Sequence, residues 1–293
     1  MRKVIPPPRA DGYTTSTPAP LYWAAYGPEG RSPLLVLHGG PGASHDYLLP
    51  QMLELARDRE LIFYDQRGGG RSRQESDTPI TWRTQVDDLG AVAREFSLEP
   101  LSIVGYSWGG LLAMLYAIEA AAGWAPISPA RMVLIDPAPA DRGHRQEFEA
   151  EFNTRQQSDT IRRMREELAA SGMQEMDRDA YRQRAFELSV AGYFADPARA
   201  GDLTPFRVIG KVQKSIWDSL GDYDLSADLA TVRCPTLVVH GSEDPIPVAA
   251  SRKTAEALGA RFVLLEGSGH VPYVEQPEQL FPAVVAFLDE TDA

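Results

Sequence analysis

The sequence predicts an α/β fold with a mainly parallel central sheet, helices on both faces of the sheet and an inserted helical lid. Short apolar runs alternate with helical patterns along most of the chain, as is typical of βα units. The alternation stops between residues 140 and 228, where charged helical segments replace the strand pattern. The chain has 293 residues, 43% of them hydrophobic, which is enough to bury one large core. We therefore expect residues 1–139 and 229–293 to form the core and residues 140–228 to form the lid.

Apolar runs bounded by turn residues predict the strands of this sheet. Their positions are 21–26, 34–37, 61–64, 101–104, 131–135, 236–240 and 262–265. Apolar residues at helical spacing predict helices at 81–96, directly after Ser107, at 248–258, at 277–288 and, within the lid, at 161–171 and 179–192. The proline-rich start, residues 1–8, predicts a flexible or polyproline II lead-in.

Residues 105–110, with the sequence GYSWGG, lie between a predicted strand and a predicted helix. This context predicts a sharp strand-to-helix turn that holds Ser107 clear of the sheet as a nucleophile. Gly105 and Gly109 lack the Cβ atoms that would collide in such a turn. A G-x-S-x-G pattern also arises by chance in solvated turns, but the flanking strand and helix favour the catalytic interpretation.

A serine nucleophile needs a histidine base and a carboxylate that orients the histidine. His270 lies in a glycine-rich loop after the last predicted strand, and Asp244 lies in the loop after strand 236–240. The chain order Ser, Asp, His is the usual one for this kind of turn. Asp136, after strand 131–135, is a competing acid, and Glu243 adjoins Asp244. We expect Ser107, Asp244 and His270 to be the catalytic residues.

The run His38-Gly39-Gly40-Pro41-Gly42 directly follows an apolar strand. Acyl transfer places negative charge on the former carbonyl oxygen, and each preset N–H donor stabilises that charge by about 3 kcal/mol. We expect the amides of Gly40 and Trp108 to be these donors. A cis bond at Gly40–Pro41 would fix the direction of the loop. His38 is expected to bond to the backbone and not to transfer protons.

Residues 65–72, with the sequence DQRGGGRS, suggest a phosphate-binding loop at first sight. The segment follows a strand and is rich in glycine, but it lacks the lysine and the helix pattern of a P-loop. We therefore expect a structural role, in which Asp65 and Arg67 pair with each other or bond to the backbone and brace the 38–42 loop.

These motifs resemble the proline iminopeptidases, a serine peptidase family within the α/β-hydrolase superfamily. The likeness is carried by residues 38–42 with 44–49 (SHDYLL), by residues 65–72 and by residues 105–110. It implies an α/β-hydrolase fold, a triad of Ser107, Asp244 and His270, and an oxyanion hole in the 38–42 loop. It also implies release of N-terminal residues from small peptides, without a cofactor.

Two positions depart from that family where substrate choice is decided. Family members hold the substrate's amino group with lid acids and, in some, with a Glu directly after the triad Asp, where this chain has Pro245; a lid glutamate is replaced by Gln213. Burying an ammonium without a carboxylate is costly. Other lid acids could substitute, although such residues usually form a solvated face: Glu147, Glu149, Glu151, Glu187, Asp218, Asp222 and Asp224. A carboxylesterase or lactonase of small esters is therefore the alternative function.

Two further classes are disfavoured. A binding protein on the same fold would not need the Ser–Asp–His set, and epoxide hydrolases and dehalogenases with an aspartate nucleophile would not have serine at position 107. For substrate contacts, the lid carries many aromatic residues, of which we favour Trp217 and Phe206, together with Gln213 and with Gly39 in the 38–42 loop.

The composition restricts the classes of binding partner and cellular compartment that we expect. A net charge of −12 disfavours nucleic acids and anionic membranes as partners and leaves a small molecule or short peptide as the substrate. The single cysteine, Cys234, excludes an internal disulfide and fits a reducing compartment. Metal-ligand spacing is absent, so metal is not expected. No signal-peptide or membrane-spanning pattern is seen, including at residues 1–8, so a cytoplasmic protein is expected. The sequence does not indicate the oligomeric state.

Overall fold

The computed structural model describes residues 4–74 and 78–290. In these residues eight strands form one sheet in the order β1-β2-β4-β3-β5-β6-β7-β8. β2 is antiparallel to both β1 and β4, and every other neighbouring pair is parallel. The strands are β1 (Ala10–Tyr13), β2 (Tyr22–Tyr26), β3 (Leu34–Leu37), β4 (Leu61–Tyr64), β5 (Leu101–Tyr106), β6 (Pro129–Ile135), β7 (Thr236–Gly241) and β8 (Arg261–Leu265). The mainly parallel sheet expected from the sequence is thus confirmed.

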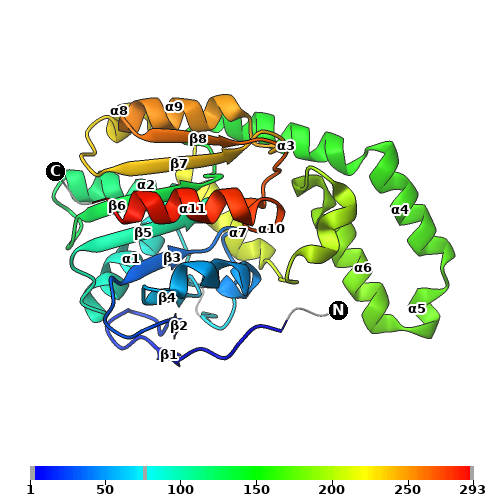
Figure 1. Cartoon of the computed structure of the whole chain (residues 1–293), viewed down its shortest axis with the longest axis horizontal. Coiled ribbons are helices and arrows are strands. Elements are labelled where there is room, and N and C mark those ends of the chain that lie inside the picture. Colours follow the sequence, from blue (N-terminus) through cyan, green and yellow to red (C-terminus); the bar gives the residue numbers. More distant parts are fainter. Residues whose placement is uncertain (1–3, 75–77, 291–293) are drawn as a thin grey trace.

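Helices cover both faces of the sheet, because alternate residues of its strands point to opposite sides. Leu35 and Leu37 of β3 pack into one buried cluster, whereas Leu34 and Val36 pack into the other. In Figure 1, α11 crosses the near face of the sheet while α1 and α2 lie behind it. The elements outside the lid are α1 (Trp82–Glu95), α2 (Trp108–Ala121), α9 (Val248–Leu258), α10 (Pro272–Glu275), α11 (Pro277–Leu288) and the 3₁₀ helices η1 (His45–Leu48) and η2 (Gln51–Ala56).

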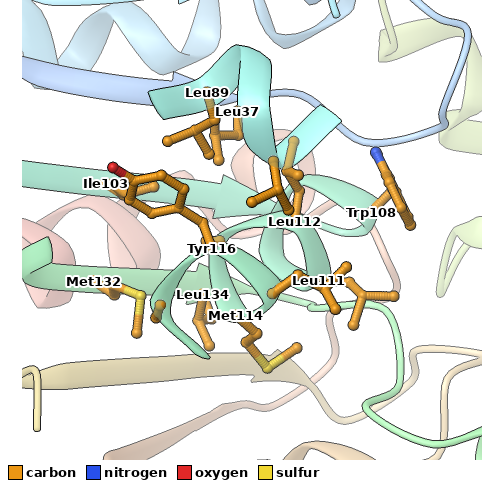
Figure 2. Close-up of a cluster of buried hydrophobic side chains, with 14 of the residues drawn as sticks. Leu37, Leu89, Ile103, Trp108, Leu111, Leu112, Met114, Tyr116, Met132 and Leu134 are labelled. Atoms are coloured by element: carbon orange, nitrogen blue, oxygen red, sulfur yellow. The ribbon is translucent and has the colours of Figure 1, made fainter. Parts of the chain in front are cut away.

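Helix α2 is the central helix of the fold. Its first ten residues, 108–117, are all buried, as expected for a helix that is apolar on every side. Figure 2 shows Leu111, Leu112, Met114 and Tyr116 of α2. They lie in one cluster with Leu89 of α1 and with strand residues Leu37, Ile103, Met132 and Leu134. Each leucine buried there contributes about 1.5–3 kcal/mol. This packing fixes the helix whose N-terminus adjoins Ser107.

The chain between β6 and β7 is helical. Its elements are α3 (Arg142–Gln156), α4 (Asp159–Ala170), α5 (Met173–Met176), α6 (Arg178–Val190), η3 (Ala191–Tyr193), η4 (Pro197–Asp202), α7 (Gly210–Leu220) and α8 (Ser226–Leu229). An isolated bridge pairs Asp141 with Asp224, near the two ends of this segment. Helices α3 to α6 extend beyond the carboxyl ends of the strands (Figure 1). We call residues 140–228 the lid, and its division from the core remains a prediction.

Three other sequence features are located as follows. Cys234 is buried. Within the described ranges, none of the helices has both the length and the apolar character that crossing a membrane requires. The expectation for residues 1–8 falls partly outside the described residues, because the first three are not among them. The strand β1 is an addition that the sequence pattern did not predict.

Candidate active site

Ser107 occupies a strained turn between β5 and α2. Its backbone has φ +53° and ψ −120°, a conformation that side chains other than glycine rarely adopt. The turn is crowded: a Cβ on Gly105 would lie 2.5 Å from the carbonyl oxygen of Gly109, and one on Gly109 would lie 2.2 Å from that of Leu37. The two glycines of the G-x-S-x-G pattern are therefore required by close backbone contacts.

The three residues expected to be catalytic lie together at the carboxyl ends of three strands. Nε2 of His270 lies 3.0 Å from Oγ of Ser107, and Nδ1 of His270 lies 2.8 Å from Oδ2 of Asp244. The amide of Ile246 donates to Oδ1 of Asp244 at 2.7 Å. Burial lowers the pKa of His270 to about 4; burial also raises the pKa of Asp244, and the hydrogen bond from the Ile246 amide offsets part of that rise. Glu243 is exposed and takes no part in this chain of contacts.

The loop that carries His270 is held by groups that the sequence interpretation missed. The amide of His270 donates to the carbonyl oxygen of Tyr193 in the lid at 2.7 Å, and its own carbonyl accepts from Tyr106 Oη at 2.7 Å. The buried carboxylate of Glu275 accepts from the amide of Gly269 at 2.7 Å and from that of Ala195 at 3.0 Å. The only sequence signal for Glu275 is its position five residues after His270.

Asp136, the competing acid, lies beside Asp244. Its Oδ1 accepts a hydrogen bond from the amide of Gly241 at 2.8 Å, whereas the partner of His270 Nδ1 is Asp244. Asp136, Asp244 and His240 bring ligand-type atoms within 4.8 Å of one another. This buried group joins the residue directly after β6 with one residue of β7 and one of the segment after β7, so sequence spacing alone gives no sign of it.

Gly40 and Trp108 line the same cavity as Ser107. Neither amide has a protein acceptor within the described residues. Gly40 has φ +57°, and the amide of Ala43 donates to its carbonyl at 2.8 Å, so a tight turn sets the direction of this loop. The expectation of a cis bond at Gly40–Pro41 is wrong: the cis bonds recorded for the described residues precede Pro50 and Pro100.

Gln66 connects the 38–42 loop to the turn at Ser107. Its amide nitrogen Nε2 donates to the carbonyl of His38 at 2.8 Å, and its Oε1 accepts from Trp108 Nε1 at 2.9 Å. The backbone amide of Gln66 donates to Nε2 of His38 at 3.1 Å, so Nδ1 carries the proton and bonds to the Gly39 carbonyl at 2.8 Å. Burial lowers the pKa of His38 to about 4. His38 is thus a neutral, structural histidine, as expected.

Asp65 and Arg67 do not pair with each other, which corrects that part of the expectation. Arg67 is paired with the buried Asp88, with Nε 2.7 Å from Oδ2. Asp65 accepts from the backbone amides of His45 and Arg71, both at 2.9 Å, and from the His45 ring. Burial would raise the pKa of Asp65, but the hydrogen bond and charge of His45 hold it well below its usual range. Asp65 therefore holds the backbone at His45 and Arg71, whereas Arg67 forms an ion pair with Asp88.

A cavity of about 420 Å³ opens above Ser107 and His270. Of the residues expected to contact substrate, Trp217, Phe206 and Gln213 line it. Gly39 does not: its amide donates to Tyr47 Oη at 2.7 Å, and it packs behind the Cβ of Ser107. The other lid aromatics on the wall are Phe148, Phe152 and Tyr193. The lid thus contributes five aromatic rings to the wall.

Two lid acids reach the cavity, and each is paired with a cation on its own helix. Glu149 pairs with Arg145 at 2.7 Å, and Asp218 pairs with Lys214. Arg145 also lies over the Trp217 ring, 3.8 Å from its centre. Pro245 is buried and offers no charge. Along the described part of the wall, the carboxylates are thus already neutralised, and the remaining lid acids considered above do not line it.

A model of the alpha/beta hydrolase family matches residues 34–283. The proline iminopeptidase of Heyndrickxia coagulans is 28% identical over 275 residues, which cover 89% of this chain and 91% of that protein.

Solved structures resemble the whole chain. The proline iminopeptidase of Mycobacterium smegmatis has a TM-score of 0.68 and 24% identity, covering 95% of this chain and 97% of that one. The enol-lactonase of Burkholderia xenovorans LB400 has a TM-score of 0.67 and 21% identity, covering 95% and 100%. The α/β-hydrolase fold expected from the sequence is confirmed by these likenesses.

Proposed function

Since this chain belongs to the alpha/beta hydrolase family, we propose that it is a serine hydrolase that works through an acyl-enzyme on Ser107. The observation that carries this proposal is the continuous line of contacts from Ser107 Oγ to His270 at 3.0 Å and from His270 to Asp244 at 2.8 Å. Nucleophile, base and orienting acid are thus within hydrogen-bonding reach in the order that such chemistry requires.

The reaction proceeds in two halves. His270 Nε2 takes the proton of Ser107 as Oγ attacks the substrate carbonyl, and the resulting imidazolium then protonates the leaving group. In the second half, His270 activates a water that attacks the acyl-enzyme and releases the acid. Asp244 accepts the Nδ1 proton's hydrogen bond, which fixes the ring tautomer and stabilises the imidazolium.

The amides of Gly40 and Trp108 supply the oxyanion hole in this proposal. Both residues line the cavity, neither amide has a protein acceptor in the described residues, and the Trp108 amide lies at the positive end of α2. Removing one such donor typically costs about 2.7–4 kcal/mol of transition-state stabilisation. Gln66 supports the oxyanion hole indirectly. Its hydrogen bonds to His38 and Trp108 fix the positions of the two segments that carry the donors.

The first candidate activity is release of an N-terminal residue, proline above all, from a short peptide. Two observations support this activity: the relative in Heyndrickxia coagulans is a proline iminopeptidase, and the chain has the motifs that resemble that family. A substrate's amino group would have to compete with Arg145 for Glu149 or with Lys214 for Asp218.

The second candidate is hydrolysis of a small ester or lactone. It is favoured by the pairing of both cavity acids and by the aromatic wall, which suit an uncharged acyl group. The side chains of Glu149 and Asp218 are 51% and 62% exposed, so exchanging the paired cation for a bound ammonium gives little net gain in these solvent-screened positions.

A paired assay separates the two candidates. The purified protein is given a prolyl arylamide, its N-acetylated form and a short-chain aryl ester, with Ser107→Ala as the control. Arylamide cleavage that N-acetylation abolishes supports the aminopeptidase. Cleavage of the ester alone supports the esterase, and activity equal to that of Ser107→Ala on every substrate contradicts the serine mechanism.

A further inference from the structure

Asp136 and Asp244 form a buried pair of carboxyl groups beneath His270. Both side chains are inaccessible to solvent, and carboxylate oxygens of the two lie within 4.8 Å of each other. Two carboxylates cannot hydrogen-bond to each other, because an ionised carboxylate only accepts. Two negative charges this close in a buried site are costly, so a proton on one of the two acids is favoured.

The surrounding donors indicate which acid holds the proton. Asp244 accepts two N–H donors, from Ile246 on Oδ1 and from His270 on Oδ2. Asp136 accepts one on Oδ1, from Gly241, while its buried Oδ2 receives no donor from the described residues. Donated hydrogen bonds favour the charged form, so the charge belongs on Asp244 and the proton on Asp136.

The backbone of Asp136 points to a built arrangement. Asp136 has φ +41°, a conformation that costs about 1–3 kcal/mol outside glycine and that persists where surrounding structure enforces it. Its amide donates to the carbonyl of Val239 at 2.9 Å, which ties the end of β6 to β7. Ser107 and Asp136, at the ends of adjacent strands, both have this unusual backbone.

We propose that Asp136 is a positioning residue for the reaction assigned to Ser107: its carboxyl group is protonated in the resting protein and donates a hydrogen bond to the carboxylate of Asp244. The pair then carries one negative charge, and Asp244 is held as the acceptor for Nδ1 of His270. This inference rests on the proposed function for its effect on catalysis, but the position of the proton does not depend on it.

The charges around the pair agree with this arrangement. Burial, followed by the charge of Asp244, raises the pKa of Asp136 well above its usual value, and the hydrogen bond from Asp136 lowers the pKa of Asp244 against the effect of burial. Arg155 and Glu275 act on Asp244, Arg252 acts on His240, and Nδ1 of His240 lies 3.3 Å from Oδ1 of Asp136.

The protein already satisfies most of the ligand-type atoms of this group, which favours a proton over a metal ion. His240 also lies in the group, but burial lowers its pKa to about 4, its Nε2 donates to the carbonyl of Ile246 at 3.0 Å, and its Nδ1 lies 3.0 Å from the Ser251 hydroxyl. Each ligand-type atom except Oδ2 of Asp136 thus already has a protein partner.

Infrared difference spectroscopy on the full chain tests the proton directly. At neutral pH, the carbonyl band of a protonated carboxylic acid should be present in the wild-type spectrum and absent from that of Asp136→Asn. Asp141→Asn is the matched control, because hydrogen bonds and the His144 partner hold the Asp141 pKa low, and its loss should remove a carboxylate band. Loss of a carboxylate band in Asp136→Asn overturns the proposal, as does a stoichiometric metal ion in the purified wild-type protein that is absent from Asp136→Asn.

Kinetics of Asp136→Asn and Asp136→Gly test the positioning role. Both residues tolerate the positive φ, but only asparagine keeps an N–H donor toward Asp244. Asn should retain kcat within a few-fold, whereas Gly should lower kcat by about 10–100-fold with little change in KM, as for other outer-layer hydrogen-bond partners. Equal kcat in the two variants overturns the role.

The acid limb of kcat/KM gives an independent readout of charge. In Asp136→Asn it should stay near the wild-type position, because the pair keeps its single charge. A fall of about one to three units would show that an ionised Asp136 had been removed from beside His270, and would overturn the proposal. If no variant and no wild-type sample is active, the infrared result still decides where the proton lies, while the serine-hydrolase proposal fails separately.

Discussion

The amide of His270 donates a hydrogen bond of 2.7 Å to the carbonyl oxygen of Tyr193, so the candidate base and the lid share a backbone contact. Gly269 has no room for a side chain beside this contact, because a Cβ there would lie 2.3 Å from the same Tyr193 oxygen. Glu275 completes the link by accepting from both Gly269 and Ala195. Movement of this part of the lid would therefore disturb the position of His270.

Glu275→Gln should weaken both stability and catalysis. Glutamine has one acceptor oxygen, so either Gly269 or Ala195 loses its partner. We expect the free energy of unfolding to fall by about 1.5–3 kcal/mol, the usual contribution of a hydrogen bond to a charged group. Denaturant titration and kcat measure the two effects. Glu278→Gln, at an exposed position three residues later, should leave both unchanged, and an equal effect there would contradict the link.

Hydrolytic activity should persist at acidic pH. Burial lowers the pKa of His270 to about 4, and the base must be neutral to accept the Ser107 proton. Neutral imidazole is therefore retained as the pH falls below 6.5, the ordinary histidine value. A pH profile of kcat/KM on the substrate identified above should show an acid limb clearly below 6.5. An acid limb at or above that value would contradict this description of His270.

Gly109→Ala should destabilise the fold severely. The new Cβ would lie 2.2 Å from the backbone oxygen of Leu37, which cannot move without shifting β3. We expect a loss of about 3 kcal/mol, at the upper end for overpacking. Gly210→Ala is the matched control, since nothing lies within 4 Å of its added Cβ, and a gain of about 0.4–1 kcal/mol is expected there. Similar melting temperatures for the two variants would refute the crowding argument.

Trp217→Ala should impair substrate binding more than chemistry. Its ring lies edge-on to Trp108, 5.1 Å between centres, and forms part of the cavity wall. Losing this wall should raise KM about ten-fold or more while kcat changes less. Trp124→Ala removes a tryptophan that is 80% exposed and should have no effect. A normal KM in Trp217→Ala would remove this residue from the substrate site.

The sheet was predictable because its inner strands are continuous apolar runs buried on both faces. The predicted bounds of β3 and β4 match the structure, and those of β5 and β7 differ only at the carboxyl end. β1 was not predictable in this way. Its sequence, ADGY, alternates between half-buried and exposed positions at the edge of the sheet, so it lacks an apolar signal.

The positions of the site residues followed from the same logic, since residues after parallel strands meet at one edge. Ser107, Asp244 and His270 come together for this reason. The supporting contacts did not follow. Gln66 forms single hydrogen bonds to segments that are far apart in the chain. Arg67 forms an ion pair with Asp88 and not with Asp65, which is nearer in sequence. Such choices depend on packing that no local pattern records.

Covalent labelling tests the central claim most directly. The wild-type protein is treated with a fluorophosphonate, and intact mass and peptide mapping locate the adduct. We expect one adduct, on Ser107, formed rapidly in wild type, absent in Ser107→Ala and much slower in His270→Ala. An adduct on another residue, or hydrolytic activity that survives Ser107→Ala, would contradict the proposal that His270 activates Ser107.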